Sequence, residues 1–162
     1  MFKNKTMKGV SASHDINIGS ILRLIVRFLQ FVLALTVAGL YGTDLHHAAQ
    51  AHKYADSKWV YAVVVAGLSA ISAVVFMLPL IKSWAFFAWD ALMFILYMAL
   101  FGTFGKLYIN ENPEGDAGII RMKHAVWVDL VNMLLWFGTA VYGTVVFFLH
   151  RRRSTFTGRA EV

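Results

Sequence analysis

Long apolar segments separated by short polar stretches dominate the pattern of this chain. The run from Trp59 to Ile81 contains no Asp, Glu, Lys or Arg. It can cross a bilayer, because a span needs about 20 apolar residues at a helical rise of about 1.5 Å per residue. Three further segments are of similar length, and each should be helical because lipid offers the backbone no hydrogen-bond partner. The pattern predicts membrane helices at about 21–43, 59–81, 83–105 and 125–149.

These segments predict an all-α membrane protein, a four-transmembrane-helix bundle over residues 21–149 with short tails at 1–20 and 150–162. Ten Lys and Arg residues fall on the side of the tails and five on the side of the longer loops. The ten are Lys3, Lys5, Lys8, Arg23, Arg27, Lys82, Arg151, Arg152, Arg153 and Arg159, and the five are Lys53, Lys58, Lys106, Arg121 and Lys123. Because the more basic side of a membrane protein stays in the cytosol, both tails are expected there.

The connections between the predicted helices should be short. Ile81 to Ser83 would form a minimal hairpin, and residues 44–58 and 106–124 would form two longer loops. The N-terminal tail has no apolar stretch of the kind found in a cleaved signal peptide, so we expect the first helix to direct insertion.

Composition supports a membrane protein and excludes several functions. With 59% hydrophobic and only 15% charged residues, the apolar excess must face lipid. The net charge of +6 is explained by the orientation, so nucleic acid is not an expected partner. The absence of Cys excludes disulfide-linked loops, palmitoylation and thiol redox chemistry.

Histidine chemistry is also not expected. All six His residues lie outside the predicted spans or at their edges, whereas a haem inside a bundle needs facing histidines within it. His46, His47 and His52 form a loose cluster whose spacing fits no closed metal site, and we interpret them as ordinary loop residues. The sequence therefore predicts no catalytic residue, no metal, no cofactor and no enzyme.

Ionisable side chains inside the predicted spans are the most informative features, since each costs several kcal/mol in hydrocarbon unless paired or hydrated. Asp90 lies about 9 Å inside the third helix, and Arg27 lies at a matching depth in the first. We predict an ion pair between them, with Arg23 as the alternate partner, and Gln30 as an interhelical hydrogen-bond donor. The functional alternative makes Asp90 a proton or cation site.

The fourth predicted helix carries a polar face. Asp129, Asn132, Trp136, Thr139 and Gly143 recur at intervals of three and four, and so lie on one side, which should point into the bundle. Candidate partners for the acid at the start of this face are Lys106, Tyr108 and Tyr41. We interpret Arg23, Arg27, Gln30, Asp90, Asp129 and Asn132 together as a structural polar network.

Small residues four apart on the first two helices predict close helix packing. They are Ala34, Ala38 and Gly42 on the first helix and Ala62, Ala66 and Ala70 on the second. The spacing leaves open whether these surfaces meet inside one bundle or between copies.

The polar residues and glycines at these positions resemble those of fungal MARVEL-domain proteins, over roughly residues 20–150. The similar features are Arg27 and Gln30 with Gly39-Leu40-Tyr41-Gly42, Trp89-Asp90 with Phe94-Ile95-Leu96 and Phe101-Gly102, and Trp127-Val128-Asp129-Leu130 with Asn132. The resemblance implies no fixed catalytic site and a role in organising membrane domains, in fungi at the plasma membrane. Implied partners are membrane lipids, including sterol or sphingolipid, and other membrane proteins or further copies of the chain.

Arg151, Arg152 and Arg153 follow the fourth predicted helix directly and precede Ser154. Three arginines at the inner surface would attract anionic lipid by about 1 kcal/mol each, and phosphorylation beside them would weaken that attraction. The alternative is a plain positive-inside anchor.

Three functions remain from the sequence. The leading hypothesis is a non-enzymatic membrane protein that organises membrane domains or associates with lipids and other membrane proteins. The alternative is a small proton- or cation-coupled transporter or channel that uses Asp90 or Asp129. A lipid-acting enzyme comes third, since only the loop histidines offer it any chemistry.

Overall fold

The computed structural model describes residues 18–51, 56–78 and 87–156, and all regular structure within these ranges is α-helical. The helices are α1 (Ile18–Gln50), α2 (Ser57–Met77), α3 (Phe87–Tyr108) and α4 (Ala117–Phe156). All four are long and apolar enough to cross a membrane. The predicted fold class is confirmed, and the chain is a multi-pass integral membrane protein.

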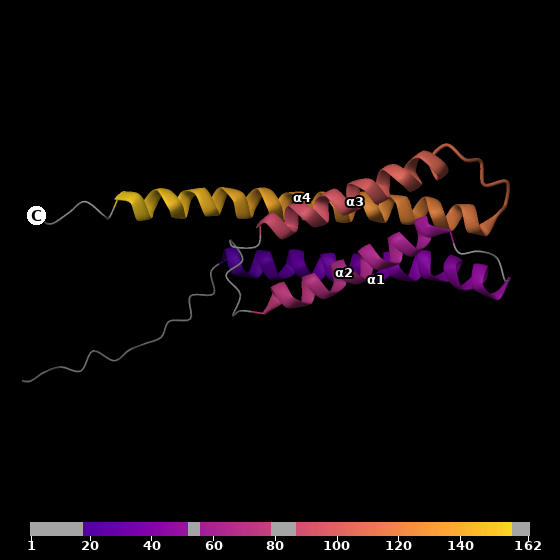
Figure 1. Cartoon of the computed structure of the whole chain (residues 1–162), viewed down its shortest axis with the longest axis horizontal. Coiled ribbons are helices and arrows are strands. Elements are labelled where there is room, and N and C mark those ends of the chain that lie inside the picture. The colour runs from indigo at the N-terminus through magenta and orange to yellow at the C-terminus, as the bar shows by residue number, and fades with distance from the viewer. Residues whose placement is uncertain (1–17, 52–55, 79–86, 157–162) are drawn as a thin grey trace, which may run out of the picture.

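The four helices alternate in direction and form two crossing pairs (Figure 1). Helix α1 packs along α2, and α3 packs along α4, while contact between α1 and α4 joins the two pairs and α2 touches α3 only slightly. Helix α1 begins and α4 ends at the same end of the bundle, which we call the terminal end (Figure 1). The opposite end, where α1 and α3 finish, is called the loop end.

The helix bounds differ from the predicted spans. Helix α1 continues to Gln50, well beyond its predicted end at residue 43, and α4 extends well beyond 125–149 at both ends. The connections at the loop end are therefore shorter than predicted. Helix α2 begins at Ser57, where Asp56 caps it by accepting a hydrogen bond from the Lys58 N–H at 3.0 Å. It ends at Met77 rather than at residue 81, because Leu78 is extended, as expected before the proline at position 79.

Helix α3 ends at Tyr108, three residues beyond the predicted span of 83–105. Its description begins at Phe87, and the hairpin predicted at 81–83 lies outside the described residues. The predicted loop of residues 106–124 therefore shrinks to the stretch between Tyr108 and Ala117.

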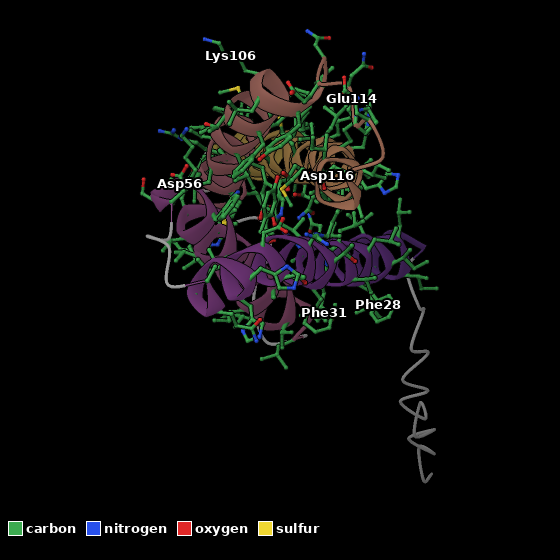
Figure 2. All side chains as sticks on the ribbon, turned by 90° about the vertical axis from the view of Figure 1, so that its right-hand side faces the viewer. Phe28, Phe31, Asp56, Lys106, Glu114 and Asp116 are labelled. Atoms are coloured by element: carbon green, nitrogen blue, oxygen red, sulfur yellow. The ribbon has the colours of Figure 1, made fainter. Side chains whose placement is uncertain are left out.

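The outer surface of the bundle is apolar, unlike that of a soluble protein. Large apolar side chains point outward along all four helices, such as Phe28, Ile71 and Tyr142, each more than half exposed. Figure 2 shows Phe28 and Phe31 on the side of α1 opposite α3 and α4. The interior holds small and aliphatic side chains, several aromatic rings and the ionisable pairs of the spans, since a polar group facing hydrocarbon would lack a partner.

Helices α3 and α4 approach closely near the terminal end. A Cβ added at Gly143 would lie 2.9 Å from the Cβ of Phe87, so this position on α4 has no room for a side chain. The polar face predicted on α4 is thus turned toward α3 at this level.

Candidate functional site

The predicted ion pair between Arg27 and Asp90 is present and lies inside the bundle. The Arg27 Nη2 donates to both carboxylate oxygens of Asp90, at 2.9 Å and 2.6 Å. Only 3% of the Arg27 side chain and 2% of the Asp90 side chain are exposed. The pair joins α1 to the first turn of α3, where an acidic side chain also interacts favourably with the helix dipole.

Further contacts hold the Arg27 guanidinium in place. Its Nη1 donates to the Gln30 Oε1 at 3.0 Å, so Gln30 acts here as an acceptor within α1 rather than as the predicted interhelical donor. The guanidinium carbon lies 4.8 Å from the centre of the Phe76 ring and 5.0 Å from the Trp136 ring. Cation–π contacts with rings of α2 and α4 therefore complete its surroundings, and this one side chain touches all four helices.

Asp129 pairs with one of its three candidate partners. The Tyr41 hydroxyl donates to the Asp129 Oδ2 at 2.6 Å and joins α1 to α4. Lys106 is exposed at the loop end, where its side chain points away from the bundle (Figure 2), and Tyr108 is only partly buried. The correct partner is the one whose whole ring is inside the bundle, 0% exposed and packed on Phe104 with ring centres 4.5 Å apart.

Several buried polar atoms near Asp129 lack a partner among the described residues. They are the Asp129 Oδ1, both side-chain polar atoms of Asn132, and the Tyr97 hydroxyl. The Tyr97 hydroxyl lies beside the side chains of Ser69 and Asn132. The predicted ion pair is therefore formed at Arg27 and Asp90, although the Arg27 Nε and the Gln30 Nε2 there also lack a partner among the described residues. Water is the usual partner of such buried groups.

A second ion pair, not predicted from the sequence, joins two helices at the loop end. Arg121 of α4 donates to Asp44 of α1 in a partly buried salt bridge. The sequence pattern predicts both residues in loops, whereas each lies in a helix that extends beyond its predicted span. A signal was available, because Asp44 is three residues after Tyr41 and Arg121 is eight before Asp129, so both continue the faces that carry that hydrogen bond.

Two hydrogen bonds from tryptophan to serine were also not predicted. The Trp89 indole N–H donates to the Ser72 hydroxyl at 2.9 Å, and the Trp136 N–H donates to Ser69 at 3.2 Å. These bonds tie α2 to α3 and α4. The two serines are three residues apart on α2, a spacing that places them on one face.

The small residues of α1 and α2 serve contacts inside the bundle, since these two helices pack closely along each other. Ala34, Ala62 and Ala66 are fully buried, and Ala38, Gly42 and Ala70 are partly buried. The three fully buried alanines therefore pack inside one bundle and not between copies. The three partly buried residues retain some exposed surface.

The remaining predicted residues lie at the terminal end. Arg23 does not pair with Asp90 and is partly exposed in a groove between α1 and α4. Arg151 is exposed, and helix α4 continues through Arg152 and Arg153, whose side chains lie outside the described ones. Among the described residues no cluster of His, Asp or Glu has the arrangement of a metal site.

Comparisons of the chain with protein-family models, with curated proteins and with solved structures give no match. The geometry of the bundle therefore carries the functional argument.

Proposed function

We propose that this protein is a non-enzymatic organiser of membrane domains, related to the MARVEL-domain proteins that its sequence resembles. It acts by presenting lipid-facing helix surfaces to lipids, to other membrane proteins or to further copies of itself. The proposal includes cytosolic tails, which the distribution of Lys and Arg supports. It also includes a plasma-membrane location, which the resemblance supports.

The closed Arg27–Asp90 pair is the observation that carries the proposal. A carboxylate that takes up and releases a proton or cation during transport must reach water at some stage of the cycle. Asp90 instead has both oxygens bonded to a guanidinium, which is itself enclosed by Gln30 and two aromatic rings. Such a pair favours a structural role for the acid, and the functional surfaces are then the outward faces of the helices.

The test is to reconstitute the protein and to measure its association and its transport in parallel. Because the chain has no Cys, Glu111→Cys at the exposed loop end gives one dye per molecule. The proposal expects several copies, or enrichment of particular lipids, in each diffusing spot of a supported bilayer. It also expects proton and cation flux in liposomes no greater than in empty ones. Single, freely diffusing copies without lipid enrichment would contradict the organising role.

A second candidate, a small proton- or cation-coupled transporter or channel, is favoured by one observation. Asp129 has no cationic partner among the described residues, and its Oδ1 and the neighbouring Asn132 and Tyr97 have buried polar atoms without hydrogen bonds. Flux in liposomes that is lost in Asp129→Asn but kept in Asp56→Asn, an exposed acid at the loop end, would replace the first proposal with this one.

A further inference from the structure

Helices α1 and α4 enclose a groove in the half of the bundle nearer the terminal end. Its volume is about 270 Å³, and apart from one arginine and two hydroxyl-bearing side chains it is lined by apolar residues. Leu22 and Arg23 line it on α1, and Leu134, Gly138 and Tyr142 line it on α4. Leu22, Leu134 and Tyr142 are all more than half exposed, so the groove opens toward the surrounding lipid.

The hollow exists partly because glycines line it. A Cβ added at Gly19 or Gly138 would meet no atom within 4 Å, which means that helix packing does not require glycine at either position. The volume is slightly below the about 300–1,000 Å³ of pockets that hold drug-sized ligands. A groove of this size and polarity fits one extended hydrocarbon chain rather than a whole lipid.

The charge of Arg23 determines what the occupant must offer. Arg23 lines the groove, and no carboxylate of the described residues bonds to it. An arginine near a membrane interface needs an anion or water for its guanidinium. A sterol in the groove would supply no anion.

A second copy of the chain fits less well than a lipid. The acids within the described spans are Asp44, Asp90 and Asp129, which are at most 9% exposed. Each of them is bonded to another side chain inside its own bundle. The described part of a docked copy would therefore bring apolar side chains against Arg23 without a countercharge. A phospholipid supplies both a chain for the groove and a phosphate for the guanidinium, and a headgroup with net negative charge attracts Arg23 more strongly than a zwitterionic one.

We propose that the α1–α4 groove is a binding site for an anionic phospholipid of the leaflet at the terminal end. One acyl chain lies in the groove between Leu22 and Gly138, and the phosphate lies against Arg23. This inference rests on the proposed association with lipids and names the lipid class. The experiment below measures lipid binding alone, so its outcome is independent of whether copies of the protein cluster. The lipid site can be absent while copies cluster, and copies can fail to cluster while the lipid binds.

Native mass spectrometry of the delipidated protein with added phosphatidylglycerol or phosphatidylcholine tests the site. Arg23→Gln should lower the preference for phosphatidylglycerol about fivefold, the contribution of one arginine near a charged membrane surface. The matched control, Lys106→Gln, removes a charge at the loop end and should leave the preference unchanged.

A second variant tests the groove independently of charge. Gly138→Leu fills the hollow and should weaken binding of both lipids, whereas Gly102→Leu, on the exposed side of α3 and also free of neighbours within 4 Å, should not. Leucine favours a helix over glycine, so neither change should prevent folding. The proposal would be overturned if wild type and Arg23→Gln had the same preference for phosphatidylglycerol. It would also be overturned if Lys106→Gln and Gly102→Leu lost as much lipid preference or binding as the groove variants, or if cholesterol displaced the lipid.

Discussion

The buried ion pair between Arg27 and Asp90 gives the sharpest prediction about stability. We consider three variants: Arg27→Met, Asp90→Leu and the double variant with both changes. Methionine is apolar and close in size to arginine, and leucine has the branched shape of aspartate. Because leucine is larger than aspartate, Asp90→Leu also adds some volume to the core, in the single and the double variant alike. The comparison separates the cost of an unpaired charge from the net contribution of the pair.

The expected losses follow from what each variant leaves behind. Arg27→Met leaves Asp90, 2% exposed, without a cation, and breaking a buried pair in this way costs about 3–5 kcal/mol. Asp90→Leu leaves Arg27 with Gln30 at 3.0 Å and two aromatic rings at 4.8 Å and 5.0 Å. These contacts offset about 1–2 kcal/mol of the cost, so this variant should lose less.

The double variant should lie within about 1–2 kcal/mol of the wild type, because an apolar pair needs no countercharge and only Gln30 loses a partner. The free energy of unfolding of each variant in lipid nanodiscs, measured by steric trapping, checks the series. Losses in the single variants that add up in the double variant would show that the two side chains do not stabilise each other. A larger loss for Asp90→Leu than for Arg27→Met would refute the assigned role of the rings.

Two further predictions concern single contacts. Tyr41→Phe removes the hydrogen bond of 2.6 Å to Asp129 and keeps the ring, so the free energy of unfolding in nanodiscs should fall by about 1.5–3 kcal/mol; an unchanged value would mean that another donor replaces the hydroxyl. Gly143→Ala places a Cβ 2.9 Å from that of Phe87 and should lower the melting temperature through a loss of about 1–3 kcal/mol. The control Gly102→Ala, where the space is open, should be neutral or stabilising by about 0.5–1 kcal/mol, and equal effects at both glycines would contradict the close approach of α3 and α4.

The sequence predicted some side-chain contacts correctly because depth in a membrane constrains pairing. Arg27 and Asp90 were matched by counting residues from the predicted membrane edge, and the structure has this pair. For Asp129 the same argument left three candidates, since Tyr41, Lys106 and Tyr108 all lie near the loop end. Only the rotation of α1 about its axis, which turns the Tyr41 ring fully inward, selects among them.

Other contacts were missed because the helices are longer than the membrane requires. A limit of about 20 residues per span assigned Asp44 and Arg121 to loops, although both are helical and pair with each other. Helix α2 is shorter than predicted. The apolar run continues to residue 81, but the helix ends at Met77 because the backbone of Leu78 is extended before the proline.

The sequence by itself determined that this chain has four membrane-spanning helices and that its buried charges need partners, because the cost of a polar group in hydrocarbon depends mainly on the residue and its depth. Only the tertiary structure decided which face of each helix meets which neighbour. The pairing of α1 with α2, the enclosure of Arg27 by rings from two other helices, and the groove between α1 and α4 all depend on packing between segments far apart in the chain. Residue spacing gives the faces of one helix, but their partners depend on how all four helices fill the interior together.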